Sequence, residues 1–549
     1  MRLKVLSFAA ALAVAGAANA QIAPLEPVET AALARDAFST GLLTRAEGAL
    51  GPDLWEGASP QILGRLLEDA PMRPPSPAVG DLLRRVLLSP GAGPVGAPAS
   101  LGGAKLTALS RLGFWEQAKT IESLSSSPNG EPDTDEALAV ADLLSGDVAA
   151  ACQKNARLTR GRDAPFWVKL RVLCYAAANE LDAAELALGL LREQNLLTER
   201  DNAIMTPLAA GGALKSPVAP EGPVQYAALQ LMKVAPTPAM LADAEAGIVK
   251  ATAFNEQAEW PVRVAAAIGA AGMGVISGEE LKALFAEAPL DLAEVSAAGD
   301  ALAHARTDPM ADVAAYQSVA SMTAPEFLRD KAALIADALD AADTMARAYA
   351  AAVLYADDIN ALQGAIVSPQ QAHAFAIARM AVGDAQGAEN WLLAMQSGGL
   401  GGMSDEESLA LIEAVGLLGL LDGAAARRIG NAANIAVETP RAPLANTGYD
   451  AGDMAEVVDA VIDAAAGRIT GQAALSAIAA ADAAAKGDPV ASVVVHRGLE
   501  TAGLADVAGR LAFEQAWSAT FAGYSSPPSA GAAMGEQGFA PRLKPSRRQ

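Results

Sequence analysis

The side chains whose types and spacing could do chemistry lie mostly in one short stretch of this chain. Six basic residues and a tryptophan fall within 18 positions: Lys154, Arg157, Arg160, Arg162, Lys169 and Arg171, with Trp167. The formal net charge of the whole chain is −23, so this basic cluster is an exception in it. Its positive side chains could bind an anionic partner, a peptide carboxylate or a glycan. The alternative is a solvated loop whose arginine stems cover apolar surface. The solvated loop is the simpler interpretation, yet the cluster is the best candidate binding site in the sequence.

Other catalytic or ligand-binding patterns are missing from the sequence. The three histidines, His304, His373 and His496, are far apart and have no metal-ligand spacing. There is no nucleophile elbow and no phosphate-binding loop, since Gly102-Gly103-Ala104-Lys105 lacks the required spacing. We therefore expect no catalytic residue, no metal and no cofactor, although 63 acidic residues leave paired carboxylates open.

The composition and the first residues indicate an exported helical protein. The chain is 52% hydrophobic with 4% aromatics, and much of the hydrophobic fraction is alanine, which favours helices over sheets. Arg2 and Lys4 precede an apolar stretch that ends in Ala18-Asn19-Ala20, which is typical of a signal peptide cleaved after Ala20. We expect a periplasmic or secreted protein without a membrane span, and the negative charge argues against nucleic-acid binding.

A turn pattern repeats along the chain with a constant period. Turn-forming residues occur at Gly113, Gly146 and Asn179, 33 residues apart, each with alanine five positions later. Apolar helical runs lie on both sides of each turn. Glycine or asparagine can adopt the positive φ that ends a helix, and alanine lets two antiparallel helices approach closely.

Residues 100–195 thus resemble three tetratricopeptide units. The third unit is the most similar, with Tyr175 before its turn and Ala184 after it, whereas Trp167, Leu170 and Val172 only approximate the family signature. The resemblance implies an all-α fold, a right-handed α-superhelix of helix hairpins. The pattern returns at four glycines further on, and these copies are either further repeats or ordinary helix hairpins. They are Gly383, Gly419, Gly503 and, imperfectly, Gly467 with Ala473.

The chain accordingly divides into six predicted segments. They are a signal peptide (1–20), an N-terminal helical capping region (21–99), tetratricopeptide-like repeats (100–195), irregular helical hairpins (222–360), C-terminal tetratricopeptide-like helical repeats (361–524) and a disordered basic tail (525–549).

The two cysteines occupy matching heights in this repeat. Cys152 falls on the second helix of one unit and Cys174 on the first helix of the next, and the midpoint between them lies in the connection. Because export permits oxidation, we predict a disulfide between neighbouring units. The alternative is a pair of small buried thiols.

The resemblance also carries the functional expectation. Tetratricopeptide-like solenoids present a concave groove to peptides or proteins, which implies a non-catalytic scaffold or adaptor of the bacterial envelope. One alternative is an exported cell-wall enzyme similar to the lytic transglycosylases, which combine a superhelix with a catalytic glutamate domain. Another is a structural protein without a specific ligand. The sequence leaves the partner and the oligomeric state open.

Overall fold

The fold of the described chain is built from helices alone. The computed structural model describes residues 36–125, 132–396, 403–433, 435, 461, 463–465, 467–485 and 489–521. Within these ranges all regular structure is helical and no strand occurs, so the all-α prediction is confirmed. The predicted signal peptide, the first part of the capping region (21–35) and the predicted tail lie outside the described residues.

The helices of the N-terminal half follow one another with short connections. In chain order they are η1 (Arg45–Glu47), α1 (Pro60–Glu68), α2 (Pro77–Leu88), α3 (Ser100–Arg111), α4 (Trp115–Leu124), α5 (Pro132–Leu144), α6 (Val148–Arg157), α7 (Pro165–Ala177), α8 (Leu181–Glu193), α9 (Glu199–Ala209), α10 (Pro223–Leu231), α11 (Pro238–Leu241), α12 (Ala246–Ala253), α13 (Trp260–Gly272) and α14 (Gly278–Glu287).

The second half continues in the same way. Its helices are α15 (Leu292–Ser296), α16 (Ala298–Ala301), η2 (Leu302–His304), α17 (Met310–Ser321), η3 (Pro325–Phe327), α18 (Leu328–Asp340), α19 (Met345–Leu354), α20 (Ala356–Ala361), α21 (Pro369–Ala381), α22 (Ala385–Met395), α23 (Asp405–Leu421), α24 (Gly423–Ala433), α26 (Thr470–Ala485), α27 (Pro489–Thr501) and α28 (Ala505–Phe521). None of the described helices is long and apolar enough to cross a membrane.

The predicted turns at 113, 146 and 179 share one backbone geometry. Gly113, Gly146 and Asn179 have φ values of 93°, 85° and 60°. In each turn the N–H of the following residue donates to the carbonyl five positions earlier, at 2.8 Å. This bond satisfies a carbonyl that the end of the helix would otherwise leave without a partner. The turns therefore lie where the sequence pattern places them.

The alanine five positions after each turn lies where two helices come close together. Ala118, Ala151 and Ala184 are fully buried, as are Ala388 and Ala508 after the later turns. The corresponding helix pairs pack against each other: α3 with α4, α5 with α6, α7 with α8, α21 with α22 and α27 with α28. A methyl group fills the contact, and a longer side chain would push the helices apart.

We expect Ala151→Leu to destabilise this part of the chain by about 2 kcal/mol, since it adds three carbons to a filled contact. Ala149→Leu, on the exposed side of the same helix, should change stability by no more than about 0.5 kcal/mol. Urea unfolding followed by the fluorescence of Trp167, which lies in the same apolar cluster as Ala151, checks both. Equal effects of the two substitutions would contradict the close approach at Ala151.

Two of the later copies differ from the prediction. Gly419 lies inside α23, which runs on to Leu421, and Ala424 is exposed. The prediction of a turn there is wrong, because the chain turns at Asp422, whose side chain caps the next helix through Ala425 N–H at 3.0 Å. Near Gly467 the positive φ belongs to Arg468 (55°). Counted from Arg468, the buried Ala473 is at the fifth position, so this copy follows the pattern one residue later.

The first helices of the hairpins do not form an open groove, because later helices of the same chain pack against them. Helix α10 contacts α5, α7 and α9, and α12 contacts α3 and α5. A Cβ atom added to Gly247 of α12 would lie 2.5 Å from the carbonyl oxygen of Arg111 at the end of α3. Much of the face that the tetratricopeptide resemblance assigns to a partner is therefore occupied by α10 and α12.

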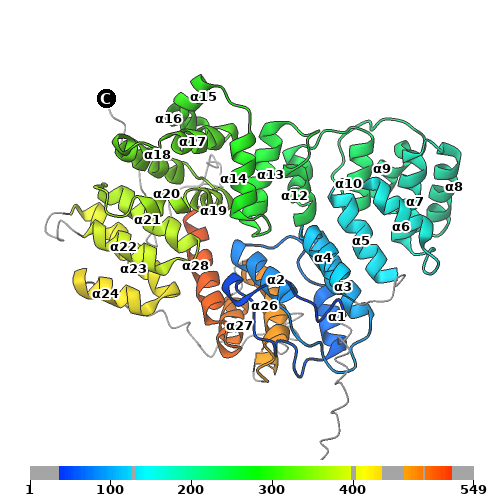
Figure 1. Cartoon of the computed structure of the whole chain (residues 1–549), viewed down its shortest axis with the longest axis horizontal. Helices are drawn as coiled ribbons and strands as arrows, with labels where there is room; N and C mark the ends of the chain where they lie inside the picture. Colours follow the sequence, from blue (N-terminus) through cyan, green and yellow to red (C-terminus); the bar gives the residue numbers. More distant parts are fainter. Residues whose placement is uncertain are drawn as a thin grey trace, which may run out of the picture.

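The two ends of the described chain also meet. Figure 1 shows α1 and α2 beside α26, α27 and α28, and contacts join α1 with α26 and α2 with both α26 and α28. The N–H of Gly471 donates to the carbonyl of Leu54 at 2.9 Å, and Arg85 pairs with Asp506 at 2.9 Å. The N-terminal region therefore packs against the C-terminal helices and does not cap a free end of the helix array.

Candidate functional site

The structure divides the basic cluster of the sequence into separate roles. Two of its lysines neutralise buried aspartates: Lys154 Nζ lies 2.5 Å from Asp142, and Lys169 Nζ lies 2.6 Å from Asp201. Burial raises the pKa of Asp201, but Lys169, Gln225 and the N–H of Thr198 outweigh it and hold the pKa below its ordinary value. These two lysines therefore serve the packing of helices and are engaged within the chain.

Trp167 also lies away from any docking surface. Its side chain is 1% exposed, and it packs in the apolar cluster of α7, α8, α9 and α10. Its carbonyl accepts a hydrogen bond from the buried Asn155 side chain at 3.0 Å. A side chain buried to this degree contacts no partner, so Trp167 is removed from the candidate binding residues.

The arginines of the cluster are the part that reaches solvent. Arg171 is half-buried and donates to the carbonyl of Arg162 at 2.8 Å, which holds the connection between α6 and α7. Arg157, Arg160 and Arg162 are exposed. A docking role for the cluster rests on these three side chains and stays a prediction.

The predicted disulfide is confirmed. Cys152 on α6 and Cys174 on α7 are joined, with their Cα atoms 5.5 Å apart. The two helices pack against each other across the connection at 158–164. The bond therefore links the second helix of one hairpin to the first helix of the next.

A wide cleft, here called the hairpin cleft, opens at the turn between α5 and α6. Its volume is about 640 Å³, and residues of α4, α10, α12 and α14 complete its walls. The lining residues that bear on recognition are Trp115, Glu116, Gln230, Phe254, Glu256 and Glu280. This volume lies within the range of ligand-binding clefts, about 300 to 1,000 Å³.

Aromatic rings on two sides of the hairpin cleft reach solvent. Phe254, just after α12, is 40% exposed, and Trp115 at the start of α4 is half-exposed. One buried cation contacts two of the lining residues: Lys250 Nζ lies 5.4 Å from the Trp115 ring centroid and 2.9 Å from Glu280. The ammonium group thus fixes both an aromatic wall and a carboxylate of the cleft.

The charge of the hairpin cleft is negative at its rim. Burial raises the pKa of Glu280, but Lys250 and the Ser277 N–H outweigh it, so that the pKa is lowered and the carboxylate is ionised at neutral pH. Glu116 and Glu256 are exposed. Lys119 is 3.8 Å from Glu116 but lies closer to the buried Asp142, at 3.2 Å. Three carboxylates therefore face the cleft, and Lys250 balances one of them.

The histidines stay apart in the structure. His373 on α21 and His496 on α27 are half-buried, which lowers the pKa of each, and His304 ends η2. Among the described residues, no group of three or more His, Cys, Asp and Glu side chains could hold a metal ion.

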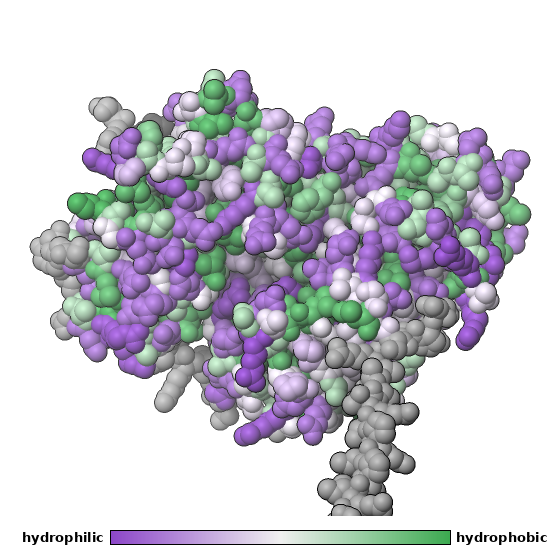
Figure 2. Space-filling model, in the orientation of Figure 1, coloured by the Kyte–Doolittle hydropathy of each residue, from purple (hydrophilic) through white to green (hydrophobic). Residues whose placement is uncertain are grey.

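The face of the molecule seen in Figure 2 is mixed in character. Figure 2 shows hydrophilic side chains over much of this face, with hydrophobic residues in small groups between them.

No family model, no curated protein and no solved structure matches the chain.

The residues of the hairpin cleft escaped the sequence pattern because they come from segments far apart in the chain. Trp115 lies two positions after the Gly113 turn, inside the repeat. Phe254 and Glu256 follow α12 and carry no repeat signal. The spacing of residues along the chain does not indicate that these two residues lie near the turn between α5 and α6.

Proposed function

We propose that this protein is a non-catalytic scaffold or adaptor of the bacterial envelope that binds a partner protein or peptide at the hairpin cleft. The observation that carries the proposal is the pairing of solvent-reaching aromatic rings with rim carboxylates in an open cleft of about 640 Å³. Aromatic side chains supply a large contact area at little cost in conformational entropy, and they are enriched at protein interfaces.

The proposal includes the finer description of the fold and its location. The equal turns, the buried alanines and the 33-residue spacing support a tetratricopeptide-like, right-handed superhelix over 100–195. The predicted signal peptide supports export to the periplasm or the medium, where the disulfide would persist.

The chemistry of the hairpin cleft favours a cationic segment as its occupant. Arginine stacks on aromatic rings and pairs with carboxylates, so an arginine of the partner would meet Phe254 together with Glu256. The acidic body of the protein attracts a basic partner from a distance. Since α10 and α12 cover the first helices of the hairpins, the partner binds at this cleft and not in a superhelical groove.

Charge reversal at the cleft tests the proposal. A fluorescent 12-residue peptide of alternating arginine and leucine should bind the full chain, and the matching glutamate–leucine peptide should not. Glu116→Lys with Glu256→Lys should weaken binding about tenfold or more, because it places like charges beside the arginines. Fluorescence anisotropy at 0.15 M salt measures the dissociation constants.

A matched control separates the cleft from the general charge. Glu185 and Glu193 are exposed on α8, and reversing both to lysine changes the net charge by the same amount. The control pair should leave the dissociation constant within about twofold, since exposed charges beyond a Debye length of about 8 Å are screened. An equal loss for both pairs would show attraction by net charge alone and overturn the assignment of the cleft.

A further inference from the structure

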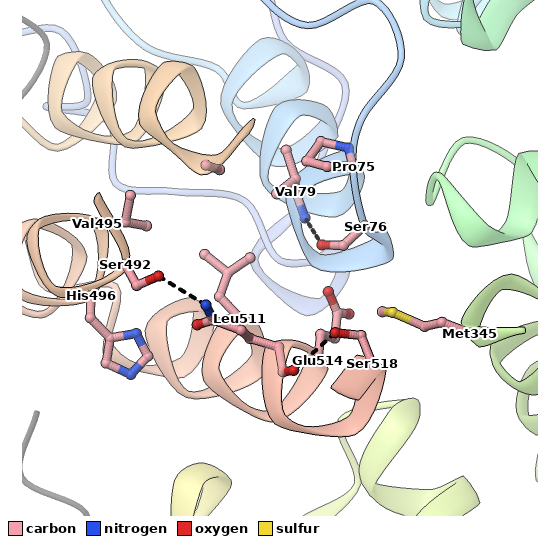
Figure 3. Close-up of a pocket in the computed structure, with 12 residues that line it drawn as sticks. Pro75, Ser76, Val79, Met345, Ser492, Val495, His496, Leu511, Glu514 and Ser518 are labelled. Atoms are coloured by element: carbon pink, nitrogen blue, oxygen red, sulfur yellow. Dashed lines mark hydrogen bonds between the residues drawn. The ribbon is translucent and has the colours of Figure 1, made fainter. Parts of the chain in front are cut away.

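A second cavity lies where the two ends of the chain meet, apart from the hairpin cleft. This cavity, here called the seam pocket, has a volume of about 210 Å³, is bordered by α2, α27 and α28, with contributions from α19 and α26, and is open to solvent on one side (Figure 3). At about 30 Å³ for each water-sized group, it accommodates a molecule of about seven non-hydrogen atoms. It is independent of the proposed partner site.

Half of the residues that line the seam pocket are apolar, and the rest, including three serines and His496, are polar. Val79 of α2, Met345 of α19, Val495 of α27 and Leu511 of α28 line it. Their side chains come from four helices that converge on one space in Figure 3. An alkyl chain placed there would be removed from water, which is favourable in proportion to the apolar area covered.

One buried carboxyl group stands at the side of the pocket that faces α2. Glu514 of α28 is 3% exposed, and its two oxygens accept hydrogen bonds from the Ala78 N–H at 3.0 and 3.1 Å. The Ser76 hydroxyl bonds it as well. An ionised carboxylate has about four acceptor positions, so these contacts leave capacity for a further donor. Burial raises the pKa of Glu514 to about 7, and both protonation states are populated at neutral pH.

The ionisable groups that face Glu514 come from each helix packed around it. Arg510, one turn earlier on α28, lowers the pKa of Glu514 through its charge, but its Nη1 is bonded to Asp81 of α2 at 3.2 Å. Tyr349 of α19 is neutral, since burial raises its pKa, and burial lowers the pKa of His496 on α27. Among the described residues that line the pocket there is no lysine or arginine. The pocket therefore offers a carboxylate whose nearest cation, Arg510, does not line the cavity.

We propose that the seam pocket binds a small organic cation with an apolar body, an alkyl- or arylammonium, whose N–H groups donate to Glu514. The carbon chain lies against Val495 and Leu511, and the exposed side chain of Gln515 marks the opening to solvent. The ammonium group supplies a hydrogen-bonded cation, whereas Arg510 acts on Glu514 only through its charge and is bonded to Asp81.

Calorimetric titration of the full chain with n-hexylammonium chloride tests this site, with n-hexanol and hexanoate as probes of equal length. We expect hexylammonium to bind with a dissociation constant about tenfold or more below that of n-hexanol, and hexanoate not to bind. At pH 7, binding should release about half a proton per ligand, because the cation favours ionised Glu514. Buffers of different ionisation enthalpy measure this release.

Two substitutions test whether hexylammonium binds in the seam pocket beside Glu514. Glu514→Gln retains an acceptor for the Ala78 N–H but removes the charge, so both the preference for hexylammonium and the proton release should be lost. Val495→Phe fills the pocket without touching the carboxyl group and should weaken hexylammonium binding about tenfold or more. Glu413→Gln, exposed on α23 and outside the lining, is the control and should bind as the unaltered chain does.

Two results would overturn the proposal. Equal binding of n-hexanol and hexylammonium would show a merely apolar cavity in which Glu514 only caps α2. Unchanged hexylammonium affinity in both Glu514→Gln and Val495→Phe would place the ligand elsewhere. Because the two variants act on different walls, misfolding of either one leaves the other as a valid test.

Discussion

Replacing Gly80 by alanine is expected to destabilise the protein by about 3 kcal/mol, the upper end of the usual cost of overpacking. Helix propensity alone predicts the opposite sign, since alanine is favoured over glycine inside a helix by about 1 kcal/mol. Gly80 lies within α2 and is buried. Urea unfolding followed by helical circular dichroism measures the change in midpoint.

The reason is the approach of α2 to the turn between α13 and α14. A Cβ atom on Gly80 would lie far inside contact distance of the Met273 carbonyl oxygen and 3.1 Å from the Cα atom of Gly274. Gly274 has a φ of 68° and in turn approaches the Pro77 carbonyl, at 2.5 Å from its own added Cβ. Both partners are backbone, so neither side can yield by a rotamer change, and α2 has to move.

Gly64 provides the matched control. It is also a helical glycine, in α1, and an added Cβ there meets no atom within 4 Å. Gly64→Ala should therefore raise stability, by up to about 1 kcal/mol. A stabilising Gly80→Ala would mean that α2 does not pack on this turn.

Removing the disulfide is expected to have an effect of similar size, but confined to one part of the chain. The bond closes a loop with a sequence separation of 22. In the chain-entropy model such a bond stabilises by about 3 kcal/mol. The double substitution Cys152→Ala and Cys174→Ala should increase amide hydrogen exchange in α6, α7 and α8 by about 100-fold, because exchange follows the free energy of local opening.

The location of the effect follows from the packing. Residues of α6 to α10, with two from α5, form an apolar cluster separate from the large cluster that contains α1 to α4 and the C-terminal helices. Helices α21 and α22 lie outside that smaller cluster, and their exchange rates should be unchanged. Reduction of the unaltered protein by dithiothreitol should reproduce the effect of the substitutions. Unchanged protection after reduction would show that non-covalent packing alone maintains this cluster.

The local elements were predictable because their causes are local. A residue at 113, 146 or 179 that tolerates positive φ ends a helix, because its N–H donates to the carbonyl three residues back and the next N–H donates to the carbonyl five residues before it. The alanine five positions later then meets the preceding helix, whichever other elements pack on the pair. The cysteines were predictable for the same reason, since they lie on adjacent helices joined by a short connection.

The pattern was wrong where its residues are common in the chain. Gly419 and Ala424 satisfy the spacing by composition alone, and the apolar run around Gly416 and Gly419 continues α23. At Gly467 the turn moved by one residue, because Arg468 adopts the positive φ. The spacing of glycine and alanine, which are common in this chain, therefore indicates a helix hairpin but does not determine which residue forms its turn.

The basic cluster shows that basic residues close together in the sequence need not form a positively charged surface in the folded protein. Lys154 and Lys169 belong to helices whose packing partners carry Asp142 and Asp201, 12 and 32 residues away. An ion pair with a buried aspartate removes the lysine from the surface charge. The exposed part of the cluster is then three arginines at the connection, and the hairpin cleft carries the opposite charge.

The sequence by itself determined the helical class, the three early turns, the alanine contacts and the disulfide, because each depends on hydrogen bonds or packing between neighbouring segments. The tertiary structure alone decided that α10 and α12 cover the hairpins, that α2 meets α28, and that Glu514 lies beside Ala78 across 436 positions of the chain. Such contacts arise from the shape complementarity of whole helices. No spacing rule along the chain encodes them.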